Sequence, residues 1–193
     1  MTPPGSRKPM IVTWQGTART SLEQVRLSVR DGRLRASGRL VVATGSPFSA
    51  SFEFSAARSG DVGRGLLRTT ADTERQISVR RTEDGIWLID RGEGVERSEF
   101  EGATDVDVAG SVTFTALPIR RLGLHRKPGE AELSVLYIST PDLTVTRVRQ
   151  TYRTVSINDQ GAIINYTDAH RSADIVVDTD GLPVMYPEVA ARL

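Results

Sequence analysis

The sequence contains no cysteine and only two histidines, His125 and His170, which stand far apart. The missing cysteine excludes disulfide bonds, thiolate nucleophiles and thiolate-bound metals. His125 lies in the basic stretch 123–129, which begins and ends with glycine, contains a proline and predicts an exposed turn, and His170 lies in another polar stretch. Two isolated imidazoles do not favour a histidine metal site. Because no glycine-rich phosphate-binding loop is present either, we predict neither a metal nor a cofactor.

Long apolar runs are missing as well. No run approaches the roughly 20 residues that a helix needs to span a bilayer, and residues 1–9 lack the apolar centre of an export signal. We therefore expect a cytoplasmic protein without a membrane span, with residues 1–9 as a flexible tail and residues 10–193 as a single domain. Charge of one sign is not in excess, because 25 Lys and Arg face 24 Asp and Glu. This balance does not favour a nucleic-acid partner.

The dominant pattern is the alternation of apolar and polar residues that is typical of half-buried β-strands. Residues 48–55 are a clear example, in which three phenylalanines and an alanine alternate with serines and a glutamate. Asp-Gly pairs at 31–32, 84–85 and 180–181 separate such runs and are typical of hairpin turns.

The number of alternating runs predicts an all-β fold of about 12–14 strands with minimal helix. A sheet of this size protects its edges by curling or closing. We therefore expect a single strongly curved antiparallel sheet that forms a barrel or half-barrel.

Two aspartates, Asp105 and Asp107, are the first candidates for a site. In an extended strand they point to the same face, about 6–7 Å apart. That spacing approaches the separation of the two carboxyl groups in an inverting glycosidase, and an Asp-x-Asp pair can also hold a divalent cation. Three interpretations stay open: a structural ion pair, contact with a ligand headgroup, and catalysis or metal binding.

Two adjacent arginines, Arg120 and Arg121, lie in the apolar frame of residues 117–124. Burying a guanidinium in such a frame is costly unless an anion or several carbonyl groups meet it. If residues 117–122 are extended, the two side chains face opposite sides of the sheet. We expect one of them to point inward, where it pairs with Asp105 or Asp107 or meets a ligand.

Aromatic residues are few, but they could stack on sugar rings or line an acyl pocket. Each could also be an ordinary core residue. From this set we select Trp87, Tyr152 and Tyr186, together with the two aspartates and the two arginines, as candidate ligand-binding residues.

The order of several motifs resembles the putative glycolipid-binding family of bacterial proteins. The resemblance rests on Gly85-Ile86-Trp87, Asp105-Val106-Asp107, Phe114-Thr115-Ala116-Leu117-Pro118-Ile119-Arg120-Arg121-Leu122, Gln150-Thr151-Tyr152, Asp178 through Leu182 and Tyr186-Pro187, with Trp14 and Glu23 upstream. It departs from the family pattern around Val112-Thr113-Phe114-Thr115-Ala116 and is loose in the first third. The resemblance implies a curved sheet or barrel similar to bacterial lipoprotein carriers.

These observations lead to three functional hypotheses. The first is a binding protein without catalytic activity, whose curved sheet holds the acyl chains of a glycolipid or another amphiphile while the charged residues meet its head. The second is an enzyme that acts on a sugar or lipid-linked sugar through Asp105 and Asp107. The third is a structural β-domain without a small ligand, in which the charged residues fix the strand register.

Overall fold

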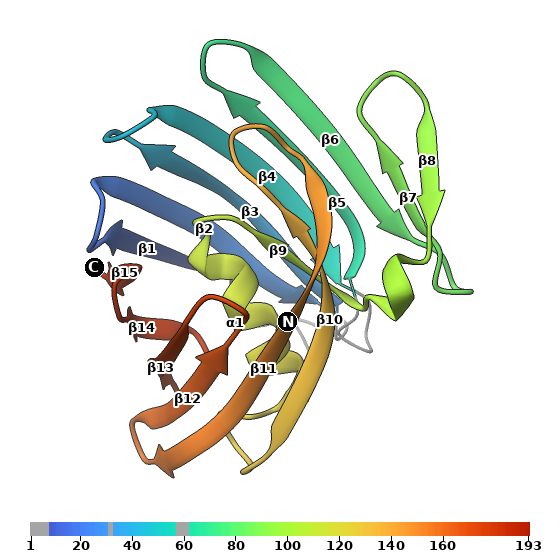
Figure 1. Ribbon diagram of the computed structural model, residues 1–193. Helices are drawn as coiled ribbons and strands as arrows, with labels where there is room; N and C mark the ends of the chain where they lie inside the picture. The colour runs from blue at the N-terminus through green and yellow to red at the C-terminus, as the bar shows by residue number, and fades with distance from the viewer. Residues whose placement is uncertain (1–7, 31–32, 57–61) are drawn as a thin grey trace, which may run out of the picture.

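Figure 1 shows the computed structural model of the protein, which describes residues 8–30, 33–56 and 62–193. Of the predicted tail, residues 1–7 lie outside the described residues, and so does the Asp-Gly pair at 31–32.

The described residues form fifteen strands in one sheet. They are β1 (Met10–Gly16), β2 (Ser21–Arg30), β3 (Arg33–Val42), β4 (Phe48–Ala56), β5 (Val62–Thr70), β6 (Glu74–Arg81), β7 (Trp87–Asp90), β8 (Val95–Ser98), β9 (Asp105–Val108), β10 (Glu130–Ile138), β11 (Val145–Asn158), β12 (Gly161–Thr167), β13 (Ser172–Asp178), β14 (Pro183–Tyr186) and β15 (Ala190–Arg192). Two helices accompany them, the short 3-10 helix η1 (Phe100–Gly102) and α1 (Val112–Leu122).

The sheet consists of two meanders that meet at one seam. Strands β1 to β8 follow one another in space as in sequence, and so do β10 to β15. The seam is the antiparallel pair β1–β15, in which Trp14 lies opposite Arg192. The Trp14 indole N–H reinforces it by donating to the carbonyl oxygen of Pro183 at 2.8 Å. The sheet is strongly curved but not closed, since β8 and β9 are its two edges (Figure 1). The predicted all-β, half-barrel architecture is confirmed, with slightly more strands than expected.

Alternation explains which face of each strand is buried. In β4 the three phenylalanines Phe48, Phe52 and Phe54 point to the concave side and are buried, while Ser49 and Glu53 between them point outward. This arrangement places one continuous apolar layer on the inside of the curve, where burial of apolar surface stabilises the fold.

The helix α1 corrects the expectation that residues 117–122 are extended. It runs for 11 residues and ends at Gly123, which adopts the left-handed conformation (φ 68°) that glycine tolerates best. The segment carries Pro118 and β-branched residues such as Thr113 and Thr115, which have low helix propensity. Its residues from 112 to 119 are all buried, so no polar face marks a helical period in the sequence. Packing inside the curved sheet outweighs local propensity here.

The same helix explains the single parallel strand pair of the described sheet. A chain that leaves β9, passes through α1 and returns as β10 has a crossover connection, which allows two strands to run parallel. Asp107 on β9 thereby lies beside Tyr137 on β10.

The helix lies inside the curve of the sheet, as Figure 1 shows, and its first two turns pack on the first meander. The Phe114 ring packs edge-on against the rings of Phe52 and Phe54, each with a centroid distance of 5.2 Å. A cavity among these rings measures only about 10 Å³, which is too small for a ligand. A much larger space on the concave side lies next to the second meander.

Candidate functional site

A cavity of about 810 Å³ lies beside the second meander. Its walls come from β9, the start of α1, β10, β11, the turn between β12 and β13, and the turn between β14 and β15. Ligand-binding pockets in proteins commonly measure about 300–1,000 Å³. The cavity is thus large enough for a small organic ligand.

Asp107 is the acidic residue on the β9 side of this cavity. One of its carboxylate oxygens accepts the Val108 backbone N–H at 2.8 Å, and the other accepts a hydrogen bond from Gln150 Nε2 at 2.7 Å. Burial raises the pKa of the Asp107 carboxyl to about 6, although these two hydrogen bonds favour the charged form. The Asp107 carboxyl therefore keeps its proton to a higher pH than an ordinary aspartate does.

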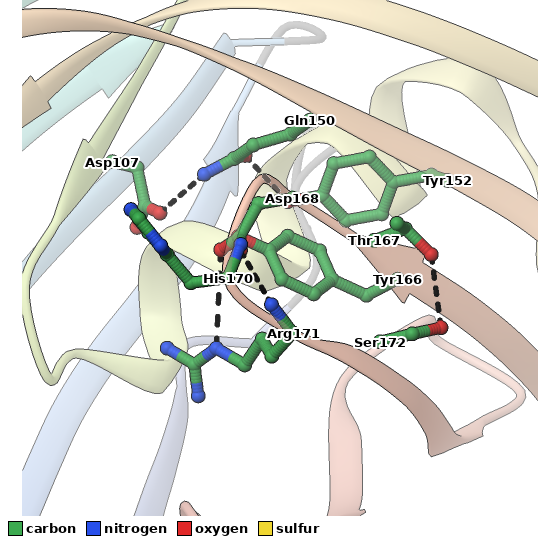
Figure 2. A network of polar contacts seen from close by, with 9 residues as sticks. All are labelled: Asp107, Gln150, Tyr152, Tyr166, Thr167, Asp168, His170, Arg171 and Ser172. Atoms are coloured by element: carbon green, nitrogen blue, oxygen red, sulfur yellow. Dashed lines mark hydrogen bonds and ion pairs between the residues drawn. The ribbon is translucent and has the colours of Figure 1, made fainter.

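Gln150 links this carboxyl to the interior of the second meander. Its Oε1 accepts the Tyr152 hydroxyl at 3.0 Å, which leaves its amide nitrogen facing Asp107. Figure 2 shows the three residues in one chain of hydrogen bonds. The Tyr152 ring is buried, and burial also raises the pKa of its hydroxyl well above the ordinary value. The tyrosine is thus a neutral donor that fixes the orientation of the amide.

Aromatic rings form another wall of the cavity. Tyr166 packs edge-on against Tyr152 with a centroid distance of 5.3 Å and against Tyr186 with one of 6.0 Å. The Arg171 guanidinium lies over the rings of both Tyr166 and Tyr186, 5.9 and 5.4 Å from their centroids. This combination places two buried tyrosine rings and a cation in one wall of the cavity.

Asp168 organises the turn that carries Arg171. Its carboxylate accepts the backbone N–H groups of His170 at 2.7 Å and of Arg171 at 3.0 Å, and also the Tyr166 hydroxyl at 2.7 Å (Figure 2). Burial raises the pKa of Asp168, but these three donors outweigh it and leave the pKa below its ordinary value. Asp168 therefore loses its proton at a lower pH than Asp107 does.

The structure separates the two predicted aspartates. Asp107 lines the cavity, whereas the buried Asp105 forms an ion pair with Arg121, at 2.5 Å between Oδ2 and Nη2. Thr104 also donates to Asp105, at 2.7 Å. The expected pairing of one arginine with the aspartate strand is thus present, but Arg121 reaches it from a helix. Neither partner of this ion pair lines the cavity.

The other predicted residues also fall into two groups, those at the cavity and those elsewhere in the fold. Tyr186 lines the cavity and Tyr152 supports its wall from behind. Arg120 lies elsewhere and donates to the carbonyl oxygen of Asp180. Trp87 on β7 is fully buried, and its indole N–H donates to the carbonyl oxygen of Ala103 at 2.8 Å.

His125 is not in an exposed turn, contrary to the prediction. It is buried directly after α1, with its ring against Gly181 and Nδ1 3.4 Å from the carbonyl oxygen of Ile119. The left-handed turn at Gly123 folds the chain back onto the helix and so buries a side chain in a polar stretch of sequence.

Sequence reasoning did not select four residues that shape the cavity, namely Gln150, Tyr166, Asp168 and Arg171. Gln150 lay within a quoted motif, but strand alternation gives no reason to prefer an amide. The signal that could have identified the turn is its composition, since Asp168 is followed by Ala-His-Arg between two strand-like runs. An aspartate at that position often accepts the backbone N–H groups that follow it.

The described residues contain neither a metal-binding cluster nor a membrane-spanning helix. No group of three or more histidine, cysteine or acidic side chains in that part of the chain is arranged to hold a metal ion. None of its helices is long and apolar enough to cross a membrane.

Comparison with known proteins agrees with this architecture. The chain is similar to a crystal structure of a DUF1089 family protein from Pseudomonas aeruginosa, with a TM-score of 0.72 and 24% identity over 93% of this chain and 95% of that one. It is also similar to a β-barrel-like protein of the domain of unknown function DUF1849 from Brucella abortus, with a TM-score of 0.54 and 10% identity over 95% and 92% of the two chains. No curated protein matches the sequence.

The family assignment comes from the sequence itself. A family described as "Putative glycolipid-binding" matches residues 11–192, nearly the whole chain. The resemblance found from the order of the motifs is thereby confirmed, and the chain belongs to this family.

Proposed function

We propose that the protein binds an amphiphile with a hydroxyl-rich head, such as a glycolipid, in the cavity beside the second meander. The observation that carries the proposal is that one cavity of about 810 Å³ is lined both by a hydrogen-bonded carboxyl–amide pair, Asp107 and Gln150, and by tyrosine rings. Carbohydrate head groups need both features, because their hydroxyls form hydrogen bonds and their ring faces pack on aromatic rings.

The hydrogen bonds that Asp107 and Gln150 make within the protein determine which polar contacts they can still make with a ligand. Asp107 uses one lone pair on each oxygen, so its remaining lone pairs can accept sugar hydroxyls. Gln150 keeps one amide hydrogen that can donate. Tyr186 and Tyr166 offer ring surface to the sugar, and Arg171 lies over these rings at the border of the cavity.

The position that we propose for the acyl chain differs from the one that the sequence predicted. Acyl chains on the concave face of the first meander would have to displace α1, whose Phe114 ring packs there on Phe52 and Phe54 and leaves no room for a ligand among the three rings. Val108, Val148 and Val189 give the cavity its own aliphatic surface. We therefore place the beginning of the acyl chain against these valines.

The test is binding of a defined glycoside amphiphile, dodecyl maltoside, to the purified protein below the concentration at which it forms micelles. Isothermal titration calorimetry should give saturable one-to-one binding, and native mass spectrometry should give the matching complex. Asp107→Ala should weaken binding about tenfold or more, since it removes an acceptor and leaves the Gln150 amide unpaired. The control Asp142→Ala changes an exposed aspartate outside the cavity and should leave binding unchanged.

Two results would contradict the proposal. One is that the maltoside does not bind saturably and that solvent extraction of the purified protein yields no co-purified lipid. The other is equal weakening by the two substitutions, because the cavity would then not be the site.

An enzyme that hydrolyses a glycoside is the second candidate, favoured by the raised pKa of Asp107 beside an open cavity. A carboxyl with this pKa could protonate a leaving oxygen. The originally expected partner Asp105 is occupied by Arg121, so Asp107 would act without it. Release of nitrophenol from nitrophenyl glycosides, lost in Asp107→Asn and retained in Asp142→Asn, would favour this candidate over simple binding.

A further inference from the structure

The balanced charge of the sequence conceals an uneven distribution of arginines. Eight exposed arginines point outward from the convex side of β2 to β8. We call them the arginine face: Arg26, Arg33, Arg35, Arg39, Arg64, Arg68, Arg80 and Arg97. Only three acidic side chains, Glu53, Glu74 and Asp90, point outward from the described parts of the same strands.

The strand register brings these arginines close to one another. Arg64 on β5 lies directly opposite Arg80 on β6, and Arg39 on β3 is separated from Arg68 on β5 only by Ser51 on β4. Like charges directly opposite each other destabilise a sheet. Within the described part of the chain, none of the eight arginines forms an ion pair that would relieve this repulsion. Eight arginines against three outward-facing acidic side chains leave the described part of these strands with an excess of positive charge.

Exposed aliphatic residues lie at the border of the arginine face. Leu22 on β2 is 46% exposed and lies opposite Val41 on β3, which is 49% exposed. Ile11 on β1 is 68% exposed and lies opposite Arg26. Large aliphatic side chains next to unpaired arginines are typical of surfaces that insert into the interface of an anionic membrane.

The composition of this face distinguishes between anionic partners. Proteins that bind single-stranded nucleic acid combine basic residues with aromatic rings on which bases stack. The outward-facing side chains described on β2 to β6 include no aromatic residue, and serines and threonines stand between the arginines instead. A phospholipid surface needs guanidinium groups for its phosphates and aliphatic groups for its interface, and both are present.

We propose that the convex face of β1 to β8 docks on the surface of an anionic phospholipid bilayer. The arginine face contacts the lipid phosphates, and Ile11, Leu22 and Val41 enter the interfacial layer beside them. This surface lies on the opposite side of the sheet from the concave face that holds α1 and the cavity. The proposal is thus independent of what the cavity binds.

Co-sedimentation with vesicles tests the proposal on the full chain. Vesicles of phosphatidylcholine with 30% phosphatidylglycerol should bind the protein, and pure phosphatidylcholine vesicles should not. Arg64→Gln combined with Arg80→Gln should weaken binding about tenfold or more, because each arginine near an anionic surface contributes roughly a fivefold gain. Raising the salt concentration from 0.05 to 0.5 M should weaken wild-type binding strongly.

Three further variants make the result specific. The double variant Arg126→Gln with Arg153→Gln removes the same charge from exposed positions outside the arginine face. It should lose at most half as much binding energy as the first double variant does. Leu22→Ser with Val41→Ser should reduce the binding that persists at high salt. Asp107→Asn should bind vesicles like the wild type, which separates this surface from the cavity.

Several outcomes would overturn the proposal. These are equal binding to neutral and anionic vesicles, equal loss in the two arginine double variants, and binding to polyuridylic acid without binding to the anionic vesicles. Circular dichroism checks that the variants are folded. Removing the opposed pair Arg64 and Arg80 should not lower the melting temperature, since the pair repels itself.

Discussion

Glu23 on β2 accepts the backbone N–H of Val112, the first residue of α1, at 2.6 Å, although 89 positions separate the two residues. The same carboxylate accepts the hydroxyls of Ser111 and Thr113, both at 2.6 Å, and the Thr113 N–H at 3.3 Å. The residue before the helix makes no side-chain cap of its own. A strand glutamate therefore caps the helix and fixes it inside the curve.

Replacing this carboxylate should loosen the helix. Glu23→Gln substitutes an amide nitrogen for one acceptor oxygen and leaves buried donors without a partner, so we expect a loss of about 2–4 kcal/mol in the free energy of unfolding. Urea denaturation measures it. Glu53→Gln, an exposed glutamate on β4, should change stability by less than about 0.5 kcal/mol. Equal stability of the two variants would contradict the capping role.

The pKa of Asp107 predicts a pH dependence of stability. Because the folded pKa is raised from 3.8 to about 6, the folded state binds more protons than the unfolded state between these values. The contribution of Asp107 to stability should therefore fall as pH rises from 4 to 6 and level off above, by a total of about 1–3 kcal/mol.

The variant Asp107→Asn isolates this contribution, since other carboxyl groups titrate in both proteins. The difference in unfolding free energy between variant and wild type should shift in favour of the variant between pH 4 and pH 7. Chemical denaturation across this range measures it. A difference that is constant with pH would mean that the carboxyl has an ordinary pKa.

The buried ion pair of Asp105 and Arg121 should be costly to break from one side. Arg121→Met leaves a carboxylate that is only 3% exposed without its partner, which predicts a loss of about 3 kcal/mol or more. The double variant with Asp105→Asn should recover a large part of it. A double-mutant cycle from thermal or urea unfolding gives the coupling energy, and a coupling near zero would show that the pair has no structural role.

A substitution at Tyr152 tests whether its hydrogen bond to Gln150 holds the Gln150 side chain in place at the cavity. Tyr152→Phe removes the hydroxyl that holds Gln150 Oε1 but keeps the ring that packs on Tyr166. We expect dodecyl maltoside to bind severalfold more weakly while stability falls by only about 1 kcal/mol. Tyr137→Phe, which lines the cavity without a hydrogen bond to Gln150, is the matched control. Equal effects of the two substitutions would assign no positioning role to Tyr152.

Alternation sufficed to predict the all-β curved sheet because most strands bury one face only. It failed at α1, where every residue from 112 to 119 is buried and no exposed polar face marks the first two turns of the helix. The error carried over to Arg120 and Arg121, which were assigned to opposite faces of a strand. Their actual directions depend on where the helix docks, and that depends on the distant Glu23.

The candidate site was predicted only in part for a related reason. Asp107 and Tyr186 belong to the cavity, whereas Asp105, two residues from Asp107, has its partner elsewhere. Spacing along one strand determines which face a side chain occupies but not which neighbour it meets. That choice is made by strands and turns that are close only after folding, such as the turn at Asp168.

The seam between β1 and β15 has a kinetic consequence. Each meander consists of neighbouring hairpins, so its contacts are local and can form early, whereas the seam closes a loop of nearly the whole chain. We infer that joining the two meanders is the late, slow step of folding. Trp14, whose indole N–H bonds across the seam to Pro183, provides an intrinsic fluorophore that would report this step, once Trp87 is replaced by phenylalanine.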